Sequence, residues 1–249
     1  MSKNLAQANQ NATALQPAAR RFCVLTVGRS GSTSLMNFLG KFPDIALPCG
    51  DIDCADNELV HPVRWAQYAQ EYAKLSKLPL RTSSDLIEFF YSYHASSAYA
   101  GFKSMPNRHR DSPGFFIRPD IQFITLLRQD IASTVASFMV AMNTGSWRRI
   151  GGTQPSRWEF VQARDNQRVR KNLGYVLKNN AALRRFPNAI SLTYEDLCDP
   201  AFNNEALNRF FARQVSIDNP QPPTQGSSYV ENWDEFNGFI KNVLARIRP

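Results

Sequence analysis

The sequence pattern of this chain changes abruptly at Gly28. Before it, the run Arg21-Phe-Cys-Val-Leu-Thr-Val27 is short, apolar and rich in β-branched residues, which predicts a buried strand. After it, residues 32–41 carry apolar side chains at helical spacing. The turn between the two reads Gly28-Arg-Ser-Gly-Ser-Thr33. A glycine-containing turn between a strand and a helix start is typical of a phosphate site, where backbone amides and the helix dipole favour an anion.

Further strands and helices follow this unit in alternation. Strands are predicted at 100–105, 121–127 and 189–194, and helices at 59–77, 84–93, 130–142, 158–186, 204–212 and 234–248. Such alternation indicates an α/β fold with a central parallel β-sheet flanked by helices, and the turn after the first strand makes it P-loop-type. With no internal repeat or strong linker, we predict a single domain over 20–249. Residues 1–19, rich in Ala, Gln and Asn, are predicted to be a disordered tail.

Composition narrows the partners and the compartment. The 249 residues include 29 basic and 21 acidic side chains, a net charge of +8. This surplus suits an anionic partner such as a nucleotide, a sulfated or phosphorylated substrate or nucleic acid, but it also suits simple solubility. The four cysteines form no CxxC pair and have no histidine at metal-ligand spacing, so we predict no metal site. Without a signal-peptide core or a membrane-length apolar run, a cytoplasmic location is expected.

The turn lacks the lysine of a nucleotide-hydrolysing loop, GxxxxGK(S/T). No lysine follows Gly31, and the basic residue is Arg29 instead. A second anion-binding element is predicted where the strand 121–127 ends, because Arg128 stands at its carboxyl end and Ser133 and Ser137 share a face of the next helix. The alternative for this segment is that Asp130 caps the helix and the serines face solvent.

These motifs together resemble carbohydrate-type sulfotransferases. The turn resembles their 5'-phosphosulfate loop, P-R-S/T-G-S/T-T/H, and Arg128 with Ser137 resembles their 3'-phosphate site. The separation of nine residues, with Asp130 after the arginine, fits the bacterial branch of nodulation-factor and trehalose sulfotransferases. Thr193-Tyr-Glu-Asp-Leu197 resembles the family's Y-E-D/R-L turn, and Val230-Glu-Asn-Trp-Asp-Glu235 resembles its C-terminal x-N-x-x-E-L segment.

The resemblance implies an enzyme that transfers a sulfuryl group from 3'-phosphoadenosine-5'-phosphosulfate (PAPS) to a hydroxyl, without a metal. The acceptor would be a carbohydrate, a glycolipid or another small hydroxylated metabolite, and not a nucleic acid. Arg29 would neutralise the departing nucleotide, and Lys103, in a G-x-K segment, would reach the sulfate or the acceptor. The residues implied to hold PAPS are Arg29, Ser30, Gly31, Ser32, Thr33, Ser34, Arg128 and Ser137.

Several residues are candidates for the base that accepts the hydroxyl proton. The family's bacterial branch uses a Glu in a G-E segment after the first helix, and the matching residue here is Asp51, one methylene shorter. Asp53 is the fallback, followed by His61 or His109, and Gly50-Asp51 is alternatively an ordinary turn. Trp147, Arg148 and Arg149, in the Gly-rich loop 143–156, suit contacts with a sugar and an anionic group.

Two other function classes remain open at this point. One is a nucleotide-dependent kinase or other P-loop phosphotransferase; the missing lysine and the arginine at the end of the strand 121–127 disfavour it. The other is a non-catalytic module that binds an anion or nucleic acid, which the net charge permits. Magnesium dependence separates the kinase from the sulfotransferase, and turnover separates both from the binding module.

Overall fold

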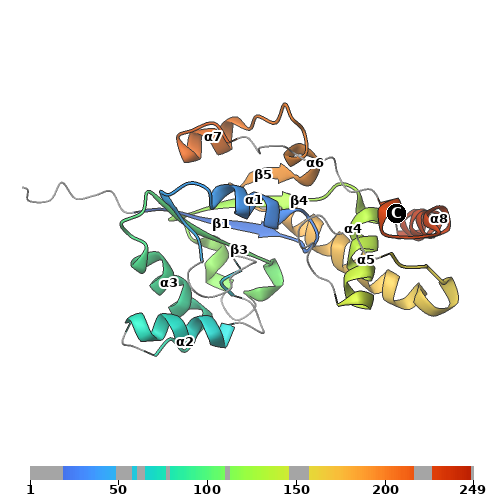
Figure 1. Ribbon diagram of the computed structural model, residues 1–249, viewed down its shortest axis with the longest axis horizontal. Coiled ribbons are helices and arrows are strands. Elements are labelled where there is room, and N and C mark those ends of the chain that lie inside the picture. Colours follow the sequence, from blue (N-terminus) through green and yellow to red (C-terminus); the bar gives the residue numbers. More distant parts are fainter. Residues whose placement is uncertain are drawn as a thin grey trace, which may run out of the picture.

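The protein folds around a sheet of five parallel strands in the order β2-β3-β1-β4-β5, with helices on both faces (Figure 1). The computed structural model describes residues 19–48, 58–60, 65–76, 79–109, 113–145, 157–215 and 226–247. The strands are β1 (Arg20–Thr26), β2 (Ile45–Ala46), β3 (Tyr99–Ser104), β4 (Ile121–Leu127) and β5 (Ile190–Thr193). The predicted α/β class with a central parallel sheet flanked by helices is confirmed.

Eight α-helices and three short 3-10 turns accompany the sheet in the part of the chain that is described. The helices are α1 (Ser32–Leu39), α2 (Trp65–Ser76), α3 (Ser83–Tyr93), α4 (Ile131–Thr144), α5 (Gln162–Arg184), α6 (Tyr194–Leu197), α7 (Glu205–Phe211) and α8 (Trp233–Ile247). The 3-10 turns are η1 (Pro106–Arg108), η2 (Pro113–Ile117) and η3 (Gly226–Ser228). None of these helices is long and apolar enough to cross a membrane, a finding that covers the described residues.

Some elements and helix starts differ from the predicted ones. The strand β2 was not predicted, because two residues carry no detectable pattern. The helix α5 begins at Gln162 rather than at 158, because Trp158 forms an isolated parallel bridge with Val230 instead. The N-cap of α3 is Thr82, whose side chain accepts a bond from the amide of Asp85, while the Asp85 carboxylate accepts one from the Thr82 amide.

The sheet is buried on both faces, and the side chains of β1 alternate between two cores. Phe22 and Val24 pack with α1 and α7, whereas Cys23 and Leu25 pack with the helices α3, α4, α5 and α8. This period-two alternation is the normal consequence of strand geometry. Both neighbours of β1 run parallel to it, so its amide and carbonyl groups are satisfied on either side.

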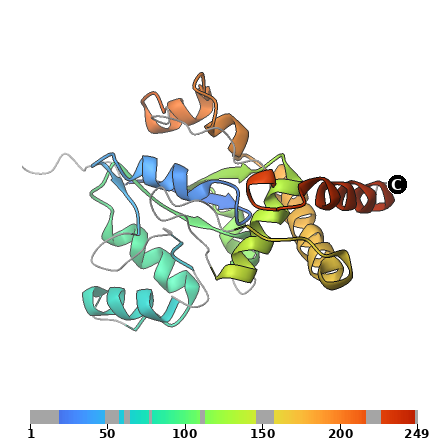
Figure 2. The same cartoon turned by 45° about the vertical axis from the view of Figure 1, so that its right-hand side comes forward.

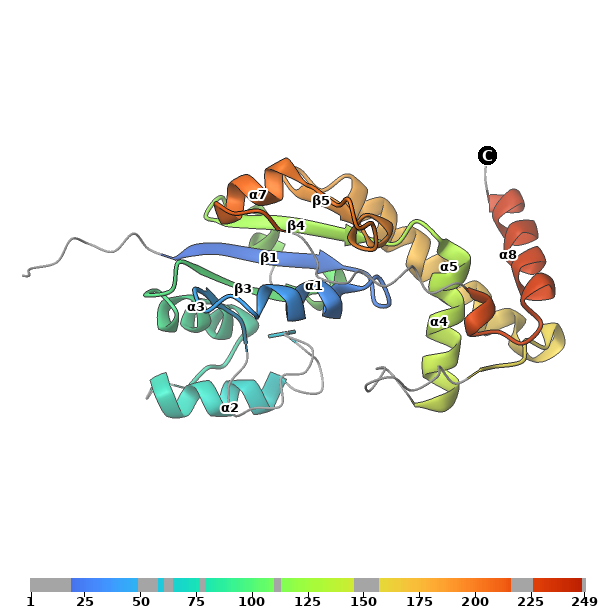
Figure 3. The ribbon, with the colours of Figure 1, turned by 45° about the horizontal axis from the view of Figure 1, so that its top comes forward.

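The connections around β1 create a switch point in the sheet. The chain leaves β1 through α1 toward β2 on one side, and it leaves β4 through α4 and α5 toward β5 on the other. Right-handed crossovers then place α1 and α4 on opposite faces. In open α/β sheets, ligands bind beyond the carboxyl ends of strands where the direction of connection reverses. In Figures 1, 2 and 3, α4, α5 and α8 stay beside one another at that end of the sheet.

Candidate functional site

Two residues of the turn after β1 have left-handed backbone conformations, and no side chain caps the start of α1. Gly31 is the N-cap residue of α1 and has φ 79°, so it lies in the left-handed region and offers no capping side chain. Arg29 is also left-handed, with φ 68°. The first amides of a helix have no partner within the helix and carry its positive dipole end. Because Gly31 has no side chain, the first backbone amides of α1 receive no side-chain cap.

The buried hydroxyl groups of Ser30 and Thr26 connect this turn to the sheet. The Ser30 hydroxyl donates to the carbonyl of Val27 at 2.6 Å and contacts the Thr26 hydroxyl. Thr26 in turn donates to the carbonyl of Leu126 on β4 at 3.1 Å. Sequence reasoning predicted Ser30 as a phosphate ligand, but the structure turns its hydroxyl inward, beneath the loop. Its contribution in this arrangement is to fix the loop against β4.

Arg29 joins the turn to α4. Its Nε donates to the Ser137 hydroxyl at 2.7 Å, and Ser137 is buried. The two residues were predicted to serve different anion-binding elements, and the structure brings them into direct contact. A charged donor held by a hydroxyl has a restricted orientation, which limits the entropy lost when it also binds an anion.

Tyr194 connects the turn to Arg128. A Cβ atom at Gly31 would lie 2.2 Å from a ring carbon of Tyr194, so the ring rests directly on the glycine backbone. The Arg128 guanidinium stands over the same ring, 4.8 Å from its centroid, and the residue is only 4% exposed. The aromatic ring thereby sets the separation between the loop and the buried guanidinium.

The segment between β4 and α4 is fixed by two carboxylates. Glu195 accepts bonds from the backbone amides of Gln129, at 3.0 and 3.1 Å, and of Asp130, at 3.2 Å. Asp130 caps α4 by accepting from the amide of Ser133 at 2.9 Å and also binds the Ser133 hydroxyl. The capping role of Asp130 in the alternative is confirmed, but Ser133 and Ser137 are both buried rather than facing solvent. Ser137 bonds to Arg29 instead.

The remaining residues of the turn differ in how far they are exposed. Ser32 is buried, Thr33 is half-buried and Ser34 is exposed, all in the first turn of α1. Asp51, Asp53, His61 and the loop residues Trp147, Arg148 and Arg149 lie outside the described residues.

Lys103 and Glu58 form a second polar feature at the carboxyl end of the sheet. Lys103 is in β3, 5% exposed, and its register partner on β1 is Val24, so it lies on the face that α1 covers. Glu58, 3% exposed, forms an isolated parallel bridge with Lys103. Buried Lys and Glu side chains are rare and concentrate at functional or ion-paired positions. Glu58 was missed from the sequence, because an isolated Glu in a segment without periodicity carries no signal.

His109 proves to be a packed residue. Its ring stacks on Phe115 with centroids 4.2 Å apart, and its Nε2 lies 2.7 Å from the Ser104 hydroxyl. Burial lowers the pKa of His109 to about 4, from an ordinary value of 6.5. The neutral ring faces the core opposite the α1 side of β3, which weakens its earlier candidacy as the base.

This burial predicts a pH-dependent stability. The unfolded chain binds a proton at His109 below pH 6.5 while the folded chain resists it, so stability is complete above that pH and declines as pH falls toward 4. Between pH 7 and pH 5 we expect a loss of about 2 kcal/mol in the unfolding free energy, measured by urea denaturation. In the variant His109→Gln, the unfolding free energy should depend much less on pH between 7 and 5. The variant His94→Gln should keep most of the wild-type pH dependence. If the unfolding free energy changes equally with pH in the wild type and both variants, the burial of His109 is not the cause of the pH dependence.

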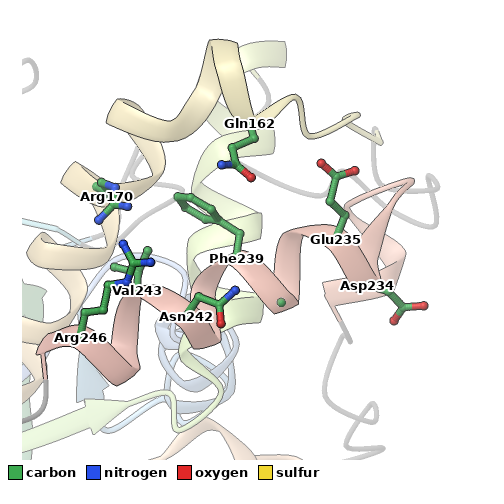
Figure 4. A pocket seen from close by; sticks show the side chains of 9 residues that line it. Gln162, Arg170, Asp234, Glu235, Phe239, Asn242, Val243 and Arg246 are labelled. Atoms are coloured by element: carbon green, nitrogen blue, oxygen red, sulfur yellow. The ribbon is translucent and has the colours of Figure 1, made fainter.

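A separate groove lies between α5 and α8 (Figure 4). Its volume is about 350 Å³, and its lining is Gln162, Arg170, Asp234, Glu235, Gly238, Phe239, Asn242, Val243 and Arg246. None of these residues belongs to the turn or to the Arg128 segment. Arg170 stands over the Phe239 ring, 5.4 Å from its centroid, and mixed acidic and basic side chains select no particular charge of ligand.

The C-terminal segment that carries Asn232 has a packing role. The Asn232 side chain accepts from the Phe160 amide at 2.9 Å and donates to the Phe160 carbonyl at 2.8 Å. It also donates to Glu235 at 2.8 Å. These bonds tie the start of α8 to the residues that precede α5, and α4 contacts η3 nearby.

Comparisons add no further assignment. The chain matches no model of a known protein family, and no curated protein sequence matches it. Among the described residues, no group of three or more His, Cys, Asp or Glu side chains is arranged to hold a metal ion.

Proposed function

We propose that this protein is a sulfotransferase that moves a sulfuryl group from PAPS to a hydroxyl. The single observation that carries the proposal is the convergence of two distant motifs: Arg29 bonds to Ser137, and Tyr194 links Gly31 to Arg128. PAPS carries a 3'-phosphate and a 5'-phosphosulfate, so it needs two anion-binding elements held at a fixed distance from each other. The contacts of Tyr194 with Gly31 and Arg128 hold the turn and the Arg128 guanidinium in such a fixed arrangement.

The residues present fit a nucleotide with two anionic ends. The amides at the start of α1 and the hydroxyls of Ser32 and Thr33 suit the 5' end. The buried Arg128 guanidinium, with its planar fork of donors, suits the 3'-phosphate. Ser30 contributes by bracing the loop. The fold is then of the P-loop type, with Arg29 in place of the lysine of nucleotide-hydrolysing loops.

Positioning and charge stabilisation would supply most of the catalysis. As the acceptor oxygen bonds to sulfur, the bond from sulfur to the bridging oxygen breaks, and its electron pair leaves on the 5'-phosphate. Arg29, whose orientation is restrained by its bond to Ser137, would stabilise this growing negative charge. Lys103, at the carboxyl end of the neighbouring strand, is our candidate for contact with the sulfate.

The acceptor hydroxyl must lose a proton to a base. Asp51 is the candidate from the sequence, and Glu58 is the carboxylate that the described residues add, beside Lys103. A base variant should lower turnover without weakening nucleotide binding. Glu58→Gln and Asp51→Asn, compared for both properties, therefore separate the two candidates.

The proposal is tested by titrating the protein with 3'-phosphoadenosine-5'-phosphate (PAP) in a calorimeter, with EDTA present, and then with ATP and magnesium. We expect metal-independent binding of PAP, weak binding of ATP, and release of PAP from PAPS when an acceptor is added. Preferential binding of magnesium-ATP would instead identify a kinase. Binding of PAP without turnover of any hydroxylated acceptor would identify a nucleotide-binding module.

A further inference from the structure

Three half-buried side chains from separate elements meet beside Gly28. A Cβ atom at Gly28 would lie 2.9 Å from Phe138 Cζ and 3.5 Å from Met105 Cε. The Tyr175 hydroxyl donates to the Met105 sulfur at 3.7 Å, and the rings of Phe138 and Tyr175 meet edge to face at 5.9 Å. We call Met105, Phe138 and Tyr175 the apolar cluster; each keeps part of its surface exposed.

The apolar cluster and Tyr194 contact different ends of the same turn. The Tyr194 ring, over which the Arg128 guanidinium stands, adjoins Gly31. Phe138 and Met105 of the apolar cluster adjoin Gly28, immediately before Arg29. In an in-line displacement, the entering and leaving groups stand on opposite sides of the transferred group. If the nucleotide binds at the Gly31 end of the turn, the acceptor approaches the sulfate from the Gly28 end. The apolar cluster is the surface beside Gly28.

We propose that the acceptor hydroxyl is carried on an apolar, aromatic-sized group that packs on the apolar cluster. This inference rests on the proposed sulfotransferase function and narrows its substrate class. Aromatic rings and a flexible thioether favour flat apolar ligands, through edge-to-face and sulfur–aromatic contacts. A bare sugar would cover these side chains without satisfying its own hydroxyl groups there.

The test uses 2-naphthol as the probe and N-acetylglucosamine as the matched sugar. Each is titrated by calorimetry into the protein saturated with PAP, and we expect 2-naphthol to bind and N-acetylglucosamine to show no binding at the same concentration. Met105→Gln should weaken 2-naphthol about tenfold or more, whereas Met105→Leu, of similar size but apolar, should keep the affinity. Ile117→Ala, at an exposed apolar residue elsewhere, is the control and should change nothing.

The outcomes separate this inference from the function on which it rests. A protein that fails to bind PAP overturns both. A protein that binds PAP but not 2-naphthol, or that prefers the sugar, overturns the apolar acceptor and leaves the sulfotransferase standing. Equal 2-naphthol affinities for Met105→Gln and Met105→Leu also overturn it, because the apolar cluster would then not contact the ligand.

Discussion

Replacing Arg128 by alanine should weaken the binding of PAP by about 100-fold or more, because in the proposed site the buried guanidinium is the charged donor to the 3'-phosphate. Arg128 is nearly inaccessible and is held over Tyr194 at the end of β4. The variant Arg128→Lys keeps the charge but loses the planar fork, so an intermediate affinity is expected. Calorimetry with PAP is the measurement.

The specific signature of this prediction is the comparison with AMP, which lacks the 3'-phosphate. Wild-type protein should prefer PAP to AMP, and Arg128→Ala should bind both with similar low affinity. The exposed Arg184 of α5 offers the control, Arg184→Ala, which should leave both affinities unchanged. If Arg128→Ala folds normally and still prefers PAP, then Arg128 does not bind the 3'-phosphate.

Replacing Gly31 by alanine should damage both stability and nucleotide binding. The left-handed backbone at φ 79° strains any residue with a Cβ atom, and that atom would overlap the Tyr194 ring. Together the strain and the displaced ring should cost about 2–4 kcal/mol of unfolding free energy. Moving the ring also displaces Arg128, so the affinity for PAP should fall as well.

The matched control is another glycine with the opposite expectation. Gly174 lies within α5, and a Cβ atom there would meet nothing within 4 Å. Gly174→Ala should therefore stabilise the protein by about 0.5–1 kcal/mol, because alanine has the better helix propensity. Urea unfolding of both variants checks the pair. A Gly31→Ala protein as stable as the wild type would show that the turn adopts another conformation in solution.

Local pattern was sufficient for the parts of this fold that depend on near neighbours. The strand β1, the turn and α1 follow from apolar periodicity and from the glycine at the helix start, and β4 agrees with its predicted bounds. Asp130 was recognised as a possible cap because a capping bond spans only three residues. The resemblance to sulfotransferases, carried by short motifs, stays a prediction.

Contacts between distant residues required the tertiary structure. Arg29 and Ser137 are 108 positions apart, and no local pattern states that they touch. The same holds for the Tyr194 ring against Gly31, for the apolar cluster beside Gly28, and for the inward turn of the Ser30 hydroxyl, which depends on Thr26 reaching β4.

The sequence by itself thus determined the alternation of strands and helices and the glycine-containing turn between β1 and α1. Only the tertiary structure decided which of the candidate site residues contact one another, which face Lys103 occupies, and that Glu58 is buried next to it. The physical reason is that strand order and register arise from packing two cores against both faces of the sheet. Side-chain neighbours across strands are set by that packing, whereas helix starts and turns are set by residues within a few positions.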